Sequence, residues 1–406
     1  MLHTGKEIFT NPKTGKPYKY RELFKQPKMA EFLRNISLSG KDYFYRGWWA
    51  EKAAAEIQLN KGFVTMEDFS KYKATWRQPA NTTYKKYIVQ TIGTQWGGPE
   101  LIEKVNLIEL AGIGEGNQSY LTNSSALFWL ASINRFSAFV SSFIHFGSNG
   151  ISKLKAALGL DLSNRCTKSS AEAIWEKIGT VEKMKIMNGK IKKLLGGGTG
   201  KIAVNHHSDG VVSVDKDGNV CSMVHTINSL PWGTGLFVQG NALSNFGSIY
   251  KAAVNLTEPG ERLADAQQPI IVFKKHQRSL STSLNEVLVS KPVLALSVVG
   301  SSLSFVTTQR FTAMLDSKMN PKQAIEAPTF YLPSPRSFQQ DIRVEKTKFS
   351  ERLLGEVRAM GQEITEVDDH EMRAIFSPDV AITIDEGNLY GCSNPITNGL
   401  AEGIKK

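Results

Sequence analysis

Apolar side chains recur every three or four residues through much of the first half of the chain, which is the spacing of one helix face. The segments with this spacing are 27–38, 47–60, 66–69 and 100–110. The most apolar stretch, 126–146, contains Asn134, Arg135 and several serines. A membrane span needs about 20 largely uncharged apolar residues. Segment 126–146 therefore predicts a buried helix.

From Ser208 onward the pattern changes to short apolar runs, which are typical of strands. The clearest pair is 211–214 and 220–227, which flank the turn sequence Asp215-Lys216-Asp217-Gly218-Asn219. Further strands are expected at 87–92, 236–238, 270–273, 293–299, 342–344, 363–367 and 380–384, and helices at 304–315 and 350–360. Many strands layered with helices predict an α+β fold with sheets at its centre. The sequence between segment 126–146 and residue 194 is basic and only weakly periodic, and no helix or strand is assigned to it.

Composition and charge limit the kinds of protein and partner that are expected. The chain has 406 residues, of which 21% are charged and 41% hydrophobic, as in globular proteins. Before Ser208 there are 30 Lys and Arg against 16 Asp and Glu, a net +14; from Ser208 onward there are 19 against 22, a net −3. The basic residues are scattered and not interleaved with aromatic ones, so no nucleic-acid partner is expected.

Metal and phosphate sites are not expected. Cys166, Cys221 and Cys392 have no CxxC spacing, which argues against a zinc site and a disulfide framework. The glycine-rich run 194–201 is not a phosphate loop, because Leu195 occupies a required glycine position and Ile202 a required Ser or Thr position. We therefore expect no cofactor and interpret the run as a mobile loop before a scissile bond.

Ser208 follows this loop and begins the strand–turn–strand segment. A serine released as a new N-terminus can use its own α-amino group as a base, because that group titrates near pH 7.7–8.0. The hairpin returns Thr226 and Asn228 to the side of Ser208, where they could orient its hydroxyl and contact a substrate. His206 and His207 are adjacent and cannot both face one metal ion from a strand, so they are interpreted as loop residues at the cleavage point. The other interpretation is that Ser208 is an ordinary residue entering a hairpin.

Several short stretches resemble the γ-glutamyltranspeptidase family of N-terminal-nucleophile hydrolases. The matching stretches, spread over nearly the whole chain, are 40–47, 62–69, 95–99, 214–219, 226–228, 233–235, 326–328 and 391–395. The resemblance implies a four-layer αββα sandwich, incomplete at its N-terminus. It also implies self-cleavage between His207 and Ser208. Residues 1–207 would then form the C-terminal part of a large subunit and 208–406 a small catalytic subunit, which stay associated.

The resemblance also implies roles for individual residues. The catalytic threonine of the family falls on Ser208, the supporting threonine on Thr226, and the oxyanion-hole glycine pair on Gly300-Ser301. Substrate-binding positions fall on Asn228, Asn245 and Asp265. The implied reaction transfers a γ-glutamyl group from a glutathione-like donor to water or an amine. Neither a cofactor nor a metal is implied.

The chain departs from the family pattern where the substrate is bound. The serines that contact the substrate carboxylate in the family fall on Asp265-Ala266, and the aspartate expected after Asn245 has no clear counterpart. The arginine expected to hold the α-carboxylate would precede Met1. These differences leave three hypotheses: an amide hydrolase or acyltransferase with another substrate, true γ-glutamyl transfer in a rearranged pocket, and an inactive, unprocessed or truncated relative with a binding role. Because Met1–Lys6 shows no signal peptide and any export signal would precede it, the location is left open.

Overall fold

A computed structural model describes the chain at residues 3–93, 97–144, 147–194, 208–226, 234–243, 254, 257–263, 265–275, 290–300, 302–332, 341–368, 377–397 and 399–404. The chain forms two compact units. One contains residues 1–76 and 226–251, and the other contains 77–225 and 252–406. Each unit takes residues from both sides of the bond between 207 and 208. The predicted boundary at this bond is a cleavage site and not a boundary between folded units, and it stays a prediction.

The smaller unit is a group of short helices packed on a strand pair. Its elements are α1 (His3–Phe9), β1 (Thr10–Asn11), β2 (Lys16–Pro17), α2 (Pro27–Ser39), α3 (Lys41–Tyr45), α4 (Trp48–Leu59), α5 (Met66–Lys71), β7 (Phe237–Val238) and β8 (Asn241–Ala242). Trp49 is buried in its core with Phe32 and Val238, and the Trp49 Nε1–H donates to the Val238 carbonyl at 3.1 Å. The helices predicted at 27–38, 47–60 and 66–69 are confirmed.

The larger unit is built on a six-stranded sheet with the order β15-β14-β10-β9-β4-β3, in which every neighbouring pair is antiparallel. Its strands are β3 (Ala80–Tyr84), β4 (Tyr87–Thr91), β9 (Ile270–Lys274), β10 (Lys291–Val298), β14 (Asp379–Asp385) and β15 (Asn388–Ser393). The central strand β10 alternates its side chains between the two faces of the sheet. Leu294, Leu296 and Val298 enter the main hydrophobic core, whereas Ser297 faces the opposite side.

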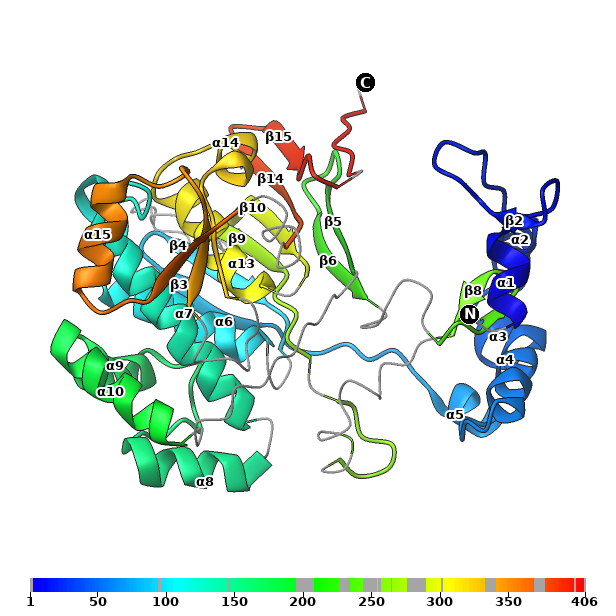
Figure 1. The fold of residues 1–406 in the computed structure, drawn as a ribbon, viewed down its shortest axis with the longest axis horizontal. Helices are drawn as coiled ribbons and strands as arrows, with labels where there is room; N and C mark the ends of the chain where they lie inside the picture. Colours follow the sequence, from blue (N-terminus) through cyan, green and yellow to red (C-terminus); the bar gives the residue numbers. More distant parts are fainter. Residues whose placement is uncertain are drawn as a thin grey trace, which may run out of the picture. The chain divides into compact units, whose positions relative to one another are not determined.

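Helices cover one face of this sheet and a hairpin covers part of the other (Figure 1). The helices are α6 (Gly97–Leu110), α7 (Ser124–Ile144), α8 (Gly147–Leu158), α9 (Lys168–Ile178), α10 (Val181–Leu194), α13 (Leu303–Leu315), α14 (Pro321–Glu326) and α15 (Glu351–Ala359), with the short 3-10 turn η1 (Glu115–Asn117). The hairpin consists of β5 (Ser208–Val214) and β6 (Val220–Thr226). A small sheet, β11-β12-β13 (Phe330–Tyr331, Ile342–Glu345, Ile364–Val367), completes this unit. The predicted α+β class is confirmed.

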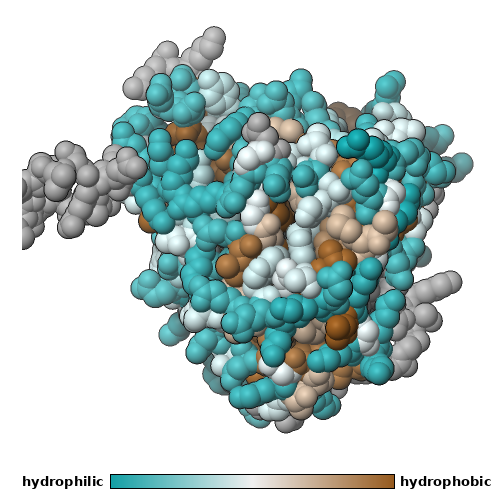
Figure 2. Space-filling model, turned by 90° about the vertical axis from the view of Figure 1, so that its left-hand side faces the viewer, coloured by the Kyte–Doolittle hydropathy of each residue, from teal (hydrophilic) through white to brown (hydrophobic). Residues whose placement is uncertain are grey.

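The helices α8, α9 and α10 correct the interpretation of the sequence before residue 194. Each has a narrow buried stripe, with Leu154 on α8, Ile174 on α9 and Met187 on α10, and lysines on the remaining surface. Figure 2 presents the side of this unit that carries α9, α10 and α15, and hydrophilic residues dominate it while apolar groups are small and separate. Because each buried stripe is narrow, the apolar residues of these helices form no clear helical pattern among the surrounding basic residues.

The apolar segment around 126–146 forms α7, and its side chains are buried against α6, α13 and α15. This confirms the predicted buried helix. Within the described ranges, no helix combines the length and apolar character that crossing a bilayer requires.

Gly98 and Gly189 give a matched test of helix packing. A Cβ at Gly98 would lie 1.7 Å from the Ile92 carbonyl oxygen, whereas a Cβ at Gly189 on α10 meets nothing within 4 Å. We expect Gly98→Ala to lower the free energy of unfolding by about 1–3 kcal/mol through overpacking. Gly189→Ala should raise it by about 0.5–1 kcal/mol, because alanine restricts the unfolded chain and favours the helix. Urea unfolding of both variants checks this, and a change of the same sign in both would contradict it.

Candidate functional site

Four of the predicted site residues lie in described parts of the chain. Ser208 is the first residue of β5, Thr226 the last residue of β6, Asp265 lies before β9, and Gly300 follows β10. The other predicted positions lie outside the described residues: His207, Asn228, Asn245 and Ser301. The roles of all eight residues stay predictions.

The carboxylate of Asp215 stabilises the turn of the β5–β6 hairpin. Its Oδ1 accepts hydrogen bonds from the backbone N–H groups of Asp217 and Asn219, both at 2.9 Å, and its Oδ2 accepts one from Asn219 Nδ2 at 2.8 Å. The Asp215 N–H donates to the Asn219 carbonyl at 3.0 Å, which sets the pairing of the two strands. The register continues along the hairpin, since His225 Nδ1 lies 3.6 Å from Asp209 Oδ2.

These hydrogen bonds lower the pKa of Asp215 below the ordinary value of an aspartate, the Asn219 side chain making the largest contribution. A carboxyl whose pKa is lower in the folded state adds stability above its unfolded pKa, and this stability is lost as the pH falls through the folded pKa. We expect an NMR titration to give Asp215 a pKa below about 3.9, and Asn219→Ala to raise it. An unshifted value in the wild-type chain would contradict the turn geometry.

Two serine hydroxyls fasten the hairpin to β10. Ser222 Oγ donates to the Leu296 carbonyl, and Ser297 Oγ donates to the Met223 carbonyl, both at 2.8 Å. Gly210 lies against the same strand, because a Cβ there would be 2.7 Å from Ser297 Oγ. The start of β5 is thus held near the end of β10. Ser208 precedes Gly210 by two residues, and Gly300 follows Ser297 by three.

Strand pairing brings further predicted residues to the same edge of the sheet. Ile270 at the start of β9 pairs with Leu296 near the end of β10, and Asp379 at the start of β14 pairs with Val298. The segment before β9, which contains Asp265, and the segment after β10, which contains Gly300, therefore both leave the sheet at this edge. We call it the catalytic edge, after the roles predicted for these residues.

The backbone at Gly300 adopts φ +96°, a conformation that glycine accepts and other residues rarely do. Hydrogen bonds hold the loop on both sides of it: the Val299 N–H donates to the Pro378 carbonyl at 2.9 Å, and the Ser302 N–H donates to Ser377 Oγ at 2.8 Å. Helix α13 begins directly after this loop, at Leu303. Backbone N–H groups at a helix N-terminus can stabilise a developing negative charge.

Asp265 is held by the N-terminus of α6. The Gly97 N–H donates to the Asp265 carbonyl at 2.9 Å, and Asp265 Oδ1 accepts a hydrogen bond from the Gln267 N–H at 3.1 Å. A Cβ at Gly97 would lie 2.1 Å from the Gln267 carbonyl oxygen, so a glycine is required for this approach. Gly97 in the matching stretch 95–99 therefore positions the Asp265 segment.

A buried ion pair behind the Gly300 loop was not predicted. The guanidinium of Arg310 on α13 contacts the carboxylate of Asp379, and both side chains are almost fully buried. Asn394 Nδ2 donates to Asp379 Oδ1 at 2.7 Å, which explains why an asparagine occupies the matching stretch 391–395. Burial disfavours the charged guanidinium, but the adjacent Asp379 and the nearby Tyr120 and Tyr331 outweigh this and raise the pKa of Arg310. The signal in the sequence was an arginine within an otherwise uncharged helix.

Within the described residues, no group of three or more His, Cys, Asp or Glu side chains could hold a metal ion. The three cysteines are free: Cys221 is exposed, and Cys166 and Cys392 are partly buried. Burial raises the pKa of the Cys166 and Cys392 thiols, which makes both less reactive at neutral pH.

Comparison with known proteins gives one family match over most of the chain. The family model described as gamma-glutamyltranspeptidase matches residues 2–404. A glutathione hydrolase proenzyme of Escherichia coli is 26% identical over 94% of this chain and 62% of its own length. A glutathione hydrolase-like YwrD proenzyme of Bacillus subtilis is 24% identical over 98% of this chain and 69% of its own length. The chain thus spans less than two thirds of the E. coli protein.

Solved structures give the same fold. The cephalosporin acylase of Bacillus halodurans superposes with a TM-score of 0.70 at 20% identity, over 100% of this chain and 68% of the acylase. A structure titled LmbA2991T421A superposes with a TM-score of 0.62 at 14% identity, over 97% of this chain and 70% of that chain. These likenesses show that the chain shares the fold of these proteins, in agreement with the predicted α+β class.

Proposed function

Because the chain belongs to the gamma-glutamyltranspeptidase family, we propose that it is a self-processing amide hydrolase or acyltransferase whose nucleophile is Ser208. Glutathione-like compounds or other small amides are the proposed substrates. Cleavage between His207 and Ser208 would give large and small subunits that remain associated.

The observation that carries this proposal is the position of Ser208 at the head of β5. The hairpin is fastened to β10 through Ser222 and Ser297, and β10 leads into Gly300 with its positive φ. This arrangement supports a hydroxyl nucleophile and oxyanion donors at one edge of the sheet. The predicted roles of Thr226 and Asn228 fit the same end of the hairpin.

Self-processing follows from attack by the chain on its own backbone. The Ser208 hydroxyl adds to the carbonyl carbon of His207, the C–N bond breaks, and the freed nitrogen takes up the hydroxyl proton. Water then hydrolyses the resulting ester, which restores the hydroxyl and leaves an α-amino group on Ser208. That amine is neutral in part at pH 7–8 and can act as a general base.

The reaction with an amide substrate uses the hydroxyl and the new α-amino group of Ser208. The α-amino group of Ser208 accepts the hydroxyl proton as Oγ attacks the substrate carbonyl, and the oxyanion is stabilised by N–H groups at Gly300-Ser301. The C–N bond breaks, the amine leaves with the proton, and an ester to Ser208 remains. Water or a second amine then releases the acyl group and restores the serine.

The negative charge of Asp265 affects which class of substrate the site would accept. A carboxylate there would repel a substrate carboxylate and attract an ammonium or hydroxyl group. The Asp265 backbone is held by Gly97, and its side chain accepts a hydrogen bond from the Gln267 N–H. The proposed substrate presents a hydrogen-bond donor to this carboxylate. We therefore propose amides with an amine or hydroxyl at that point, alongside glutathione-like compounds.

Intact mass spectrometry of the purified chain after incubation at neutral pH tests the proposal. Two species whose masses meet at the bond between 207 and 208 are expected. Release of glutamate from glutathione, compared with release of amine from a panel of small amides, then distinguishes the substrate classes. A single uncut species without amidase activity would overturn the proposal and favour an unprocessed relative with a binding role.

A further inference from the structure

The edge of the six-stranded sheet opposite the catalytic edge collects lysines. Lys85 and Lys86 form the turn between β3 and β4, Lys274 ends β9, and Lys291 begins β10. Lys274 and Lys291 are direct register partners. Like charges placed opposite each other on neighbouring strands are destabilising. Asp385 and Glu386 lie at the same end, in the β14–β15 turn, so the excess of lysine is confined to β3, β4, β9 and β10.

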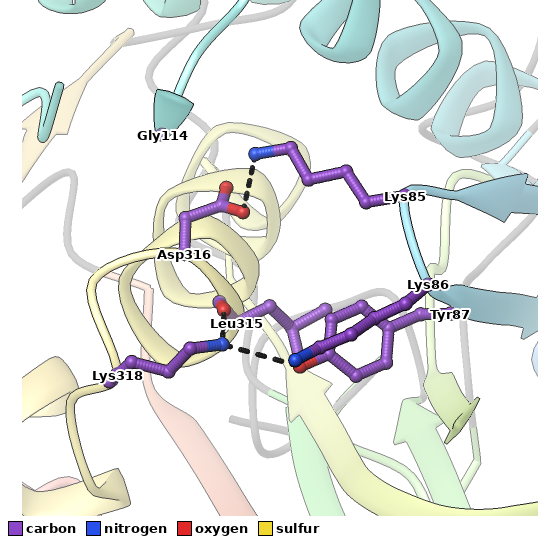
Figure 3. Close-up of a pocket in the computed structure, with 7 residues that line it drawn as sticks. All are labelled: Lys85, Lys86, Tyr87, Gly114, Leu315, Asp316 and Lys318. Carbon is purple, nitrogen blue, oxygen red and sulfur yellow. Dashed lines mark hydrogen bonds and ion pairs between the residues drawn. The ribbon is translucent and has the colours of Figure 1, made fainter. Parts of the chain in front are cut away.

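A pocket of about 250 Å³ opens at this edge. Figure 3 shows the seven residues that line it, which come from the β3–β4 turn, the segment after α6 and the end of α13: Lys85, Lys86, Tyr87, Gly114, Leu315, Asp316 and Lys318. Three lysines and one aspartate give this lining a net charge of +2. We call it the lysine pocket.

The carboxylate in the lysine pocket already has partners. Asp316 Oδ1 lies 2.8 Å from Lys85 Nζ, and Asp316 Oδ2 accepts a hydrogen bond from the Tyr84 hydroxyl at 2.7 Å. Lys85 also donates to the Ile113 carbonyl at 2.9 Å. The Asp316 side chain is only 4% exposed. Lys85 is thus the direct ion-pair partner of Asp316, whose charge acts on Lys318 only at longer range.

Lys86 and Lys318 have no carboxylate within 4.0 Å among the residues that the structure describes. Their side chains converge on Tyr87, whereas Lys85 points to Asp316 (Figure 3). The ammonium groups of Lys86 and Lys318 lie 5.6 Å and 5.7 Å from the centre of the Tyr87 ring, and Lys318 Nζ is 3.3 Å from its hydroxyl. Lys318 also donates to the Leu315 carbonyl, so among the described residues the two ammonium groups contact a phenol and a carbonyl but no carboxylate directly.

The backbone of two pocket lysines adopts a conformation that usually requires glycine or asparagine. Lys85 has φ +50° in a two-residue hairpin turn, and Lys318 has φ +56° just after the end of α13. Left-handed backbone costs about 1–2 kcal/mol in a residue with a Cβ. Hairpin turns and helix ends normally place Asn or Gly at such positions. At Lys85 the contacts with Asp316 and the Ile113 carbonyl hold this conformation, whereas the lysine at position 318 points to a role for its charge.

We propose that the lysine pocket binds a phosphate-type dianion, either inorganic phosphate or the terminal phosphate of a small molecule. The net charge of +2 matches a dianion, and lysine is a common phosphate ligand. The pocket is smaller than the 300–1,000 Å³ typical of sites for drug-sized ligands. The eight residues of β10 separate it from the catalytic edge by about 25 Å, so it is a separate site.

Isothermal titration calorimetry with sodium phosphate at pH 7.5 and constant ionic strength tests this proposal on the full chain. Saturable binding of one phosphate per chain is expected. Lys86→Met combined with Lys318→Asn should weaken it at least tenfold, because each charged hydrogen bond contributes about 1.5–3 kcal/mol. Asparagine accepts the φ of Lys318, so the melting temperature in chloride should be unchanged or higher. The control Lys177→Met removes one exposed charge on α9 and should leave binding unchanged.

Two further titrations identify the source of the anion. Succinate carries two charges without a phosphorus centre and should bind at least tenfold more weakly than phosphate. A short alkyl phosphate that binds as tightly as inorganic phosphate would indicate a phosphorylated small molecule, and weaker binding would indicate the free ion. The absence of saturable heat in the wild-type chain, equal affinity in the double variant, or equal affinity for succinate would overturn the proposal.

Discussion

Ser208→Ala is expected to leave the chain uncut and to reduce amide hydrolysis to the background rate. Alanine has no hydroxyl to add to the carbonyl of residue 207, so neither the ester nor the new α-amino group can form. Removing a nucleophile from a cooperative site commonly lowers the rate by more than about a thousandfold. Intact mass spectrometry and amidase assays on the same preparation measure both effects.

Ser213→Ala is the matched control for Ser208→Ala. Ser213 lies on the same strand, β5, but on its exposed face, so the same substitution should leave processing and folding unchanged. Ser208→Thr keeps a hydroxyl and should retain cleavage. If Ser208→Ala still splits after residue 207, or if Ser213→Ala also blocks cleavage, the assignment of the nucleophile is wrong.

Asp379→Asn is expected to lower the free energy of unfolding of the larger unit by about 3–5 kcal/mol. The substitution leaves the Arg310 guanidinium charged and buried, with a side chain only 1% exposed. It also weakens the hydrogen bond from Asn394 Nδ2. Because folded proteins are typically stable by only about 5–15 kcal/mol, this loss is large. Urea unfolding followed by circular dichroism measures it.

Asp161→Asn supplies the matched control, since it breaks an exposed ion pair. Lys155 Nζ lies 2.9 Å from Asp161 Oδ2, and both side chains are more than half exposed. Exposed ion pairs contribute about 0–1 kcal/mol. Combining Arg310→Met with Asp379→Leu should recover much of the stability, because the pair is then replaced by apolar groups. Equal losses in Asp379→Asn and Asp161→Asn would contradict the importance of burial.

Local patterns predicted many elements. The turn sequence 215–219 predicted the β5–β6 hairpin, because Asp, Gly and Asn suit a tight turn regardless of what surrounds it. The apolar run around 126–146 predicted a buried helix, and the structure places α7 there. The two-residue turn at Lys85-Lys86 gave no signal, since its left-handed lysine is fixed by contacts with Asp316 and the Ile113 carbonyl.

The sequence by itself determined the α+β class, the hairpin that begins near Ser208, and membership of a family whose motifs extend over most of the chain. These features depend on the spacing between near neighbours and on short turn sequences. The tertiary structure decided that Gly97 holds Asp265, that Asp379 neutralises Arg310 from 69 positions away, and that lysines from separate elements share one pocket. Such contacts join residues far apart in the chain, and their free energies depend on burial and charge that exist only after folding.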